Sequence, residues 1–298
     1  MKPTGIYVAA VTPRIPGAVT IDVPAALDLV QWFSDRGVNG LLLMGSTGEF
    51  PHYTIEQRAS YMRDVIKAAS IPVLVNASHS CYDGALELAR TARDAGAAGV
   101  VLMPPYYFRY SQDQLFDYFR QFGDDFKDFP LYLYNIPFFT TPLDATTACR
   151  LLDTGRFAGI KDSSGKSEYL DQILPYKNDH TAVFVGNDVV FTKMRTRGAD
   201  GVVSGVSCGL PELMVGLDQA ITSGNTAKSE KLEAHLQAYI AKIDAMPAPI
   251  GVKETVKARG LRAQEHSIPI GPALQTQLAD FHAWLKDWMP AMLDDAKA

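Results

Sequence analysis

The segment FAGIKDSSG, residues 157–165, is a short apolar run that ends in a lysine and gives way at once to hydroxyl-bearing residues and glycine. Short apolar runs recur along the whole chain, and their nearly continuous hydrophobicity is typical of strands that are covered on both faces of a parallel sheet. The runs are GIYVAAV (5–11), GLLLMG (40–45), PVLVNA (72–77), GVVLMP (99–104), LYLYN (131–135), FAGIKD (157–162), AVFVG (182–186) and GVVSG (201–205).

Amphipathic stretches separate these runs, with apolar residues recurring at three and four positions as in helices. Several of them open on Thr, Ser or Asp and close on Gly, as capped helices do. Examples are PAALDLVQWFSDRG, TIEQRASYMRDVIKAA, DGALELARTARDAG and SQDQLFDYFRQFG. Eight strands in strict alternation with helices predict a (β/α)8 TIM barrel, and an open doubly wound sheet is the alternative.

The pattern changes after the eighth strand and its helix, PELMVGLDQAITSG. Residues 225–245 and 272–295 have helical patterns, and a shorter helix is expected at 251–260, after the proline-rich joint MPAPIG. We therefore predict a barrel over residues 1–224 and a C-terminal helical extension over residues 225–298. Because no low-complexity linker separates the two, we expect the extension to pack on the barrel or on a partner subunit.

Composition excludes several classes of protein. Of the 298 residues, 47% are hydrophobic and 20% are charged, which fits a globular chain with a large core. The net charge of −5 provides no basic field for nucleic acid. No apolar run approaches the roughly 18 residues of a membrane span, and the N-terminus lacks a charged start followed by an apolar block. We expect a cytoplasmic protein.

The cysteines do not suggest a metal site. Cys81, Cys149 and Cys208 are odd in number and far apart, so they fit neither a disulfide framework nor a Cys-x-x-Cys motif. We expect all three to be small core residues, and no metal or cofactor is expected.

Lys161 is the first candidate for chemistry, because barrel active sites form at the carboxyl ends of the strands. Alternation places Phe157, Gly159 and Lys161 on one face, which we expect to point into the barrel mouth. The lysine either forms a salt bridge with Asp162 or acts as a Schiff-base nucleophile. A nucleophile must be neutral, and an ordinary lysine pKa of about 10.4 leaves about one molecule in 2500 neutral at pH 7. Its pKa must therefore fall by roughly three.

Other strand ends carry hydroxyl groups. In LYLYN the alternation sends Tyr132 and Tyr134 inward, so Tyr134 lies on the strand next to Lys161, as a proton shuttle or as a core tyrosine. GSTGE (45–49) is either a backbone cradle for a carboxylate or an ordinary turn. In PPYY (104–107) one tyrosine is expected to pack at a subunit contact and the other to have a function.

Taken together and in this order, GSTGE, Tyr106-Tyr107, YNIP (134–137) and GIKD (159–162) resemble the dihydrodipicolinate synthase/N-acetylneuraminate lyase family over the whole chain. The resemblance implies a (β/α)8 barrel with C-terminal helices. It also implies an enzyme, usually tetrameric, that condenses or cleaves pyruvate, a 2-keto acid, through a lysine Schiff base without a metal.

The resemblance implies roles for individual residues. Lys161 would be the nucleophile and Tyr134 the proton shuttle. Ser46 would relay protons between Tyr134 and Tyr107, which a neighbouring subunit would supply. Thr47 would hold the carboxylate of pyruvate.

Three further positions match the substrate pocket of the family. Gly186 and Val203 would line it through their backbones. Phe139 stands where dihydrodipicolinate synthases carry an arginine that contacts the carboxylate of the second substrate. A second carboxylate would lose its bidentate partner here, which argues against the synthase. Phe138 and Phe139 would suit a less polar aldehyde, whereas the segment 186–188 could contact a sugar chain.

We therefore predict a class I lyase that cleaves a 2-keto-3-deoxy acid to pyruvate and an aldehyde, or condenses pyruvate and an aldehyde to that acid. The GSTGE loop, with Ser46 where synthases commonly carry threonine, weakly favours an aldolase. The alternatives are 4-hydroxy-tetrahydrodipicolinate (dihydrodipicolinate) synthase and a keto-acid dehydratase that uses the same imine. A non-enzymatic keto-acid binding or structural protein is the alternative from another class.

Overall fold

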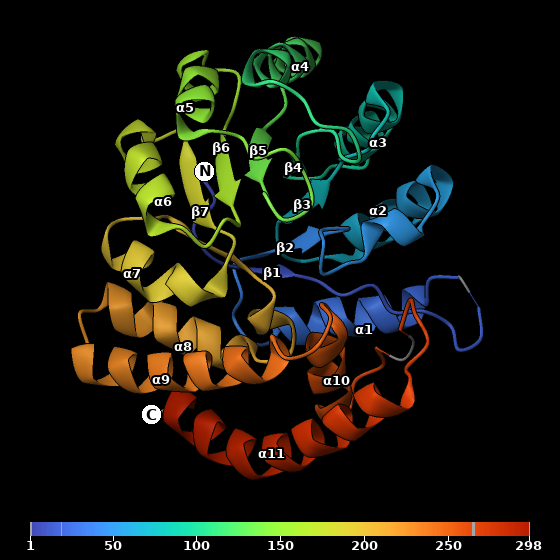
Figure 1. Cartoon of the computed structure of the whole chain (residues 1–298), viewed down its shortest axis with the longest axis vertical. Helices are drawn as coiled ribbons and strands as arrows, with labels where there is room; N and C mark the ends of the chain where they lie inside the picture. The colour runs from blue at the N-terminus through green and yellow to red at the C-terminus, as the bar shows by residue number, and fades with distance from the viewer. Residues whose placement is uncertain (1, 19, 264–265, 298) are drawn as a thin grey trace.

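The computed structural model describes residues 2–18, 20–263 and 266–297. Eight parallel strands form one closed barrel in chain order, and β8 pairs with β1 (Figure 1). The predicted (β/α)8 barrel is confirmed, and the open sheet is excluded. The strands are β1 Gly5–Ala9, β2 Gly40–Leu43, β3 Val73–Asn76, β4 Gly99–Leu102, β5 Leu131–Asn135, β6 Gly159–Asp162, β7 Ala182–Val185 and β8 Gly201–Ser204.

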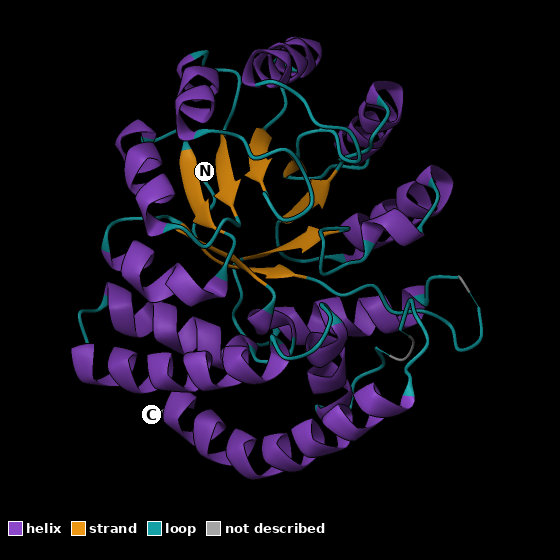
Figure 2. Cartoon of the chain, viewed as in Figure 1, coloured by secondary structure: helices purple, strands orange, loops and turns teal. Residues whose placement is uncertain are grey.

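Helices α1 to α8 alternate with the strands and surround the barrel (Figure 2). Thr54 and Ser111 begin α2 and α4 with full capping boxes, as their sequence patterns predict. The helices are α1 Val23–Ser34, α2 Ile55–Ala68, α3 Tyr82–Asp94, α4 Gln112–Asp125, α5 Ala145–Asp153, α6 Ser167–Ile173, α7 Phe191–Thr196, α8 Pro211–Thr222, α9 Thr226–Ile243, α10 Ile250–Ala258 and α11 Pro272–Lys297.

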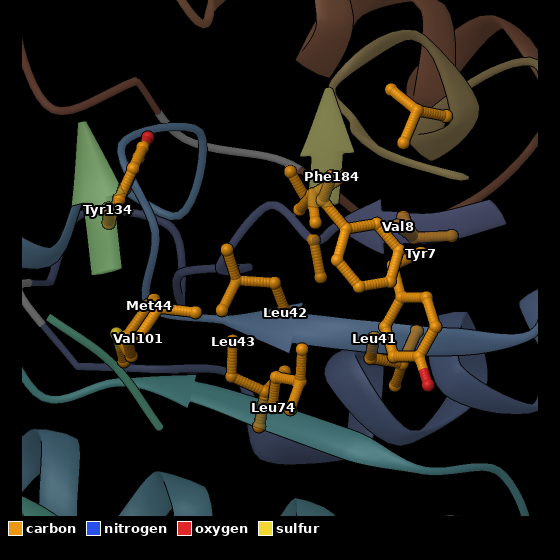
Figure 3. Packing of buried hydrophobic residues seen from close by; sticks show 14 of the residues in the cluster. Tyr7, Val8, Leu41, Leu42, Leu43, Met44, Leu74, Val101, Tyr134 and Phe184 are labelled. Atoms are coloured by element: carbon orange, nitrogen blue, oxygen red, sulfur yellow. The ribbon is translucent and has the colours of Figure 1, made fainter. Parts of the chain in front are cut away.

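Large side chains fill the inside of the barrel, so it is a packed core (Figure 3). The rings of Tyr7 and Phe184 pack edge to face, with their centroids 5.3 Å apart. Tyr132 is also buried, as expected of a side chain that points inward. A ligand can therefore enter only from an end of the barrel.

Several strands are shorter than their apolar runs. Met44 has a φ of 56°, in the left-handed region, so β2 ends at Leu43 and the expected strand over 40–45 is too long. The Asn76 side chain donates a hydrogen bond of 2.8 Å to the Met44 carbonyl and holds this turn. The chain thus leaves the barrel just before the GSTGE segment.

The predicted direction of Phe157 is wrong. Its ring packs against Phe119 of α4, with centroids 6.2 Å apart, in the layer outside the barrel. Strand β6 begins only at Gly159, whose φ of 148° breaks the alternation on which the prediction depended. Lys161 lies beyond the break and does point inward.

The C-terminal helices pack on one side of the barrel (Figure 1). Both α9 and α11 contact α8, and α10 contacts both of them. A Cβ at Gly216 of α8 would lie 3.1 Å from the carbonyl oxygen of Ala296 in α11, so glycine allows this close approach. The division into residues 1–224 and 225–298 stays a prediction.

The three cysteines were all expected to be small core residues. Cys149 and Cys208 are buried as expected, but Cys81 is exposed, because it lies in the loop just before α3.

Within residues 2–18, 20–263 and 266–297, no helix is long and apolar enough to cross a membrane.

Gly159 and Gly155 provide a matched test of the strand β6 geometry. A Cβ at Gly159 would lie 2.0 Å from the Ala182 carbonyl oxygen, whereas a Cβ at Gly155, which also has a positive φ, would meet nothing within 4 Å. We expect Gly159→Ala to lower the free energy of unfolding by roughly 2–5 kcal/mol. Gly155→Ala should cost about 1 kcal/mol. Urea denaturation measures both, and equal losses would contradict the close packing at Gly159.

Candidate active site

Lys161 and Tyr134 meet at the carboxyl ends of two neighbouring strands. The parallel register of β5 and β6 pairs Tyr134 with Lys161. The Nζ atom of Lys161 lies 3.7 Å from the centroid of the Tyr134 ring. The exposed fractions are 4% for Lys161 and 1% for Tyr134, so both side chains are largely removed from water. The prediction that they occupy adjacent strands is confirmed.

Asp162 does not form the salt bridge that was the alternative for Lys161. Its carboxylate accepts hydrogen bonds from Asn135 Nδ2 at 2.7 Å and from Ser164 Oγ at 2.6 Å. Burial raises the pKa of Asp162 to about 6, and these hydrogen bonds oppose that rise. Neighbouring residues of a strand point to opposite faces, which directs the carboxylate away from the lysine.

The Tyr134 hydroxyl is poised for proton transfer. In Figure 3 it is directed toward the carboxyl end of β5, away from the aliphatic core. Ser46 Oγ lies 3.4 Å from it. Burial by itself raises the pKa of Tyr134, but the charge of Lys161 and hydrogen bonds with Lys161, Ser46 and Ser163 outweigh burial and lower it. This hydroxyl therefore releases its proton more readily than an ordinary tyrosine does.

The loop over residues 45–49 is a tight turn, in which the Glu49 amide donates to the Ser46 carbonyl at 3.0 Å. In the described part of the chain, the backbone N–H groups of Thr47 and Gly48 have no hydrogen-bond partner. A Cβ at Gly48 would lie 3.1 Å from the carbonyl oxygen of Ala10, just after β1, so a side chain here would be tightly packed against that backbone. Free N–H groups beside a threonine hydroxyl suit a carboxylate.

A buried ion pair fixes the far end of this loop. The Lys253 ammonium, on α10, donates to the Glu49 carboxylate at 2.6 Å, and Ser267 donates to the other oxygen of Glu49. The Lys253 side chain is fully buried. Breaking such a pair typically costs about 3–5 kcal/mol, so α10 helps to hold the loop in place.

Gly186 provides the space beside Lys161. A Cβ at this position would lie 3.0 Å from Lys161 Cε and 2.3 Å from Ser163 Oγ, so any side chain would displace one of them. Asp188, two residues further on, accepts a hydrogen bond from the Val206 amide through Oδ2. Burial raises the pKa of Asp188 to about 6.

Two cavities flank the Ser46-Thr47 pair. One, here called the Ser46 cavity, has a volume of about 240 Å³ and is lined by Ser46, Glu49, Phe50, Pro51, His52, Met103, Tyr106, Phe139, Ala248 and Pro249. The other, the Thr47 cavity, has about 220 Å³ and is lined by Thr47, Gly186, Asn187, Asp188, Val189, Gly205, Val206, Ile240, Ile243 and Asp244. A larger cavity of about 680 Å³ lies at the opposite end of the barrel, far from Lys161. The two smaller cavities, in contrast, are lined by Ser46 and Thr47 of the loop that follows β2.

Comparison with known proteins agrees with this geometry. Residues 2–288 match the Dihydrodipicolinate synthetase family. The chain belongs to this family. Among its relatives, the 4-hydroxy-tetrahydrodipicolinate synthase of Oleidesulfovibrio alaskensis is 30% identical over 277 residues, which cover 91% of this chain and 94% of that protein.

Solved structures of the dihydrodipicolinate synthetase family superpose closely. YagE, a prophage protein of the family from E. coli K12 solved in complex with pyruvate, is 26% identical with a TM-score of 0.88, covering 96% of this chain and 98% of that one. The 2-keto 3-deoxygluconate aldolase from Picrophilus torridus is 27% identical with a TM-score of 0.83, covering 89% and 96%. A member of the family and an aldolase thus share this fold.

Two positions inferred from the family resemblance, Tyr107 and Val203, line neither the Ser46 cavity nor the Thr47 cavity within this chain. The Tyr107 side chain is 88% exposed, has a φ of 85° and packs on the Phe108 ring, so it does not reach Ser46. Val203 is buried in β8, opposite Tyr7 of β1, and lines neither cavity.

Sequence reasoning missed four residues that support this family site. Asn135 and Ser163 hold the ends of β5 and β6, Lys253 anchors Glu49, and Pro249 lines the Ser46 cavity. Asn135 directly follows Tyr134, and Ser163 lies two residues after Lys161. Both are polar residues at strand ends, so their polarity was a usable signal. Lys253 and Pro249 carried no such signal, because they lie far along the chain in the helical extension.

Tyr134→Phe tests the proton shuttle, and Tyr132→Phe is its matched control. The lowered pKa of Tyr134 means that one of the 13 tyrosines should ionise below the ordinary value of about 10. Burial instead raises the pKa of Tyr132. In an ultraviolet pH titration the early step should vanish in Tyr134→Phe and persist in Tyr132→Phe. Loss of a general acid–base group should lower kcat by about 10²–10⁴-fold. An unchanged kcat in Tyr134→Phe would contradict the shuttle.

Proposed function

We propose that this chain is a class I pyruvate-dependent carbon–carbon lyase, which cleaves a 2-keto-3-deoxy acid to pyruvate and an aldehyde or runs the same reaction in reverse. The observation that carries the proposal is the buried Lys161 against Tyr134, with no carboxylate paired to the lysine among the described residues. The neutral amine of a lysine is the form that attacks a carbonyl, and the buried Lys161 lies where a keto acid can reach it from the rim of the barrel.

The keto-acid carboxylate binds, in this proposal, at Thr47 and the free N–H groups of the loop. Thr47 lines the cavity that also contains Gly186, and Gly186 leaves room beside Lys161 Cε. A carboxylate held there presents C2 of the keto acid to Lys161 Nζ. The complex of YagE with pyruvate supports a keto acid as the ligand of this fold.

The chemistry then proceeds through an imine. Lys161 Nζ attacks C2, and Tyr134 delivers the proton with which the carbinolamine oxygen leaves as water. Tyr134, as phenolate, takes the proton of the C4 hydroxyl, and the C3–C4 bond breaks with its electron pair moving to the iminium nitrogen. The aldehyde departs, C3 of the enamine is protonated, and water hydrolyses the imine to free pyruvate and Lys161. Ser46 connects Tyr134 with the proton path.

Two neighbouring reactions remain as second candidates. Relatives named 4-hydroxy-tetrahydrodipicolinate synthase favour the condensing reaction, but Phe139 lines the cavity where that enzyme would need an arginine for a second carboxylate. A dehydratase would use the same imine. The aldolase from Picrophilus torridus favours cleavage. A cytoplasmic location stays a prediction from the sequence.

Borohydride trapping tests the nucleophile. The protein is incubated with pyruvate or with 2-keto-3-deoxy acids and reduced, and the intact chain is weighed beside Lys161→Ala. We expect a covalent adduct in the wild type and none in the variant, since reduction fixes only an imine. The control variant is Lys166→Ala, which removes an exposed lysine from the loop after β6. Lys253→Ala is not suitable, because it breaks the buried ion pair with Glu49. Absence of any adduct would contradict the proposed lyase function and favour the alternative of a keto-acid binding protein.

We further propose that the chain forms a homo-oligomer, a tetramer by family resemblance, in which a neighbouring subunit supplies Tyr107. The exposed Tyr107 and Phe108 rings, 5.0 Å apart, support a contact there, because large adjacent aromatic side chains are usually buried at interfaces.

Light scattering after gel filtration measures the oligomer. We expect a mass of about four times 32.6 kDa, and a lower mass together with lower activity in Tyr107→Asp, because the charge cannot be buried at an interface. A fully active wild-type monomer would contradict a shared Tyr107.

A further inference from the structure

The Ser46 cavity has an apolar wall. Phe50, Met103, Tyr106, Phe139 and Pro249 surround Ser46, and the Phe50 and Tyr106 rings pack edge to face, with centroids 5.7 Å apart. Its volume of about 240 Å³ lies below the roughly 300 Å³ at which sites for drug-sized ligands begin. The space suits a small and largely apolar group.

The charged groups near this wall are already engaged. The carboxylate of Glu49 is held by Lys253 and Ser267. The Arg58 guanidinium lies over the Phe50 ring and donates to the carbonyls of Asn76 and Ser78, away from the cavity. No lysine or arginine side chain lines the Ser46 cavity in the part of the chain that the structure describes. Among the described lining residues, His52 is the one that can carry a positive charge, so a ligand carboxylate would lack the bidentate guanidinium partner that such groups favour.

The reaction places the aldehyde half on this side of the site. The C4 hydroxyl must reach the Tyr134 oxygen, and Ser46 Oγ, 3.4 Å from that oxygen, lines the Ser46 cavity. The opposite cavity contains Thr47, which the proposed mechanism assigns to the keto-acid carboxylate. With C1 at Thr47 and C2 at Lys161, the substituent on C4 extends past Ser46 toward Phe139.

We propose that this substituent is a small alkyl or phenyl group, so that the enzyme releases an apolar aldehyde rather than a sugar aldehyde or one that carries a carboxylate. The inference rests on the proposed lyase function and specifies its substrate class. The bond that breaks is still C3–C4, the aldehyde carbon is the former C4, and its apolar substituent takes no part in the electron flow.

The exposure of Phe139 supports this occupant. Phe139 is 63% exposed and lines the cavity, whereas the adjacent Phe138 is 72% exposed and is not one of the lining residues. An apolar substituent would cover the Phe139 ring and remove both surfaces from water. Hydroxyl groups placed there would lose hydrogen bonds to water without finding partners on the ring.

The first test is an aldehyde panel. Pyruvate is condensed with 2-methylpropanal, benzaldehyde, D-glyceraldehyde and aspartate semialdehyde, and pyruvate trapping is measured in parallel. We expect kcat/KM to be at least tenfold higher for the first two. Preference for either polar aldehyde, or no condensation in spite of normal trapping, overturns the substrate class and leaves the imine chemistry standing. No trapping of pyruvate overturns the lyase function itself.

The second test compares neighbouring substitutions. Phe139→Arg should lower kcat/KM for benzaldehyde at least tenfold, mainly through KM, and raise that for aspartate semialdehyde, because the guanidinium faces the cavity. Phe139→Leu should retain most of the activity with 2-methylpropanal. Phe138→Arg is the matched control, which adds the same charge outside the cavity and should leave both values unchanged. Equal effects of Phe138→Arg and Phe139→Arg would overturn the role of the Phe139 wall.

Discussion

The contact between Lys161 and Tyr134 depends on the parallel pairing of β5 with β6, which brings the two residues opposite each other at the rim of a packed barrel. A lysine in this position is desolvated by the core beneath it, yet it meets the solvent-facing end of the barrel, where a keto acid can arrive. Gly186 makes room for the lysine chain, and Asp162 is bound by Asn135 and Ser164. The same strand ends therefore position the amine and hold the carboxylate of the adjacent Asp162 in other hydrogen bonds.

The loop that faces this pair is held from two directions. On the barrel side Asn76 binds the Met44 carbonyl, and on the outer side Lys253 of α10 binds Glu49. A buried ion pair is weak support for overall stability but a strong constraint on geometry, because either charge left alone in the interior is costly. The helical extension thus contributes to the site, since α10 fixes the loop and the preceding Pro249 lines the Ser46 cavity.

Ser46 and Thr47 are adjacent in the loop but line different cavities, so the site has two distinct sides. The Thr47 side combines free N–H groups with Asn187 and Asp188, whereas the Ser46 side is mostly aromatic and aliphatic. If the proposed imine chemistry is common to the dihydrodipicolinate synthetase family, a difference in the second substrate has to come from walls such as Phe139. The chemistry and the choice of aldehyde then depend on separate residues.

Sequence patterns alone predict the eight strands, the barrel, the capped helices and the adjacency of Tyr134 and Lys161, because hydrophobic period and chain order are local properties that the closed sheet preserves. It failed at Phe157, where the positive φ of Gly159 interrupts the alternation. The folded chain was needed to show that Lys253 binds Glu49, 204 residues earlier in the chain, and that Pro249 lines the Ser46 cavity. Such contacts depend on how the C-terminal helices pack against the barrel, and no pattern within one segment specifies which side chain another segment will meet.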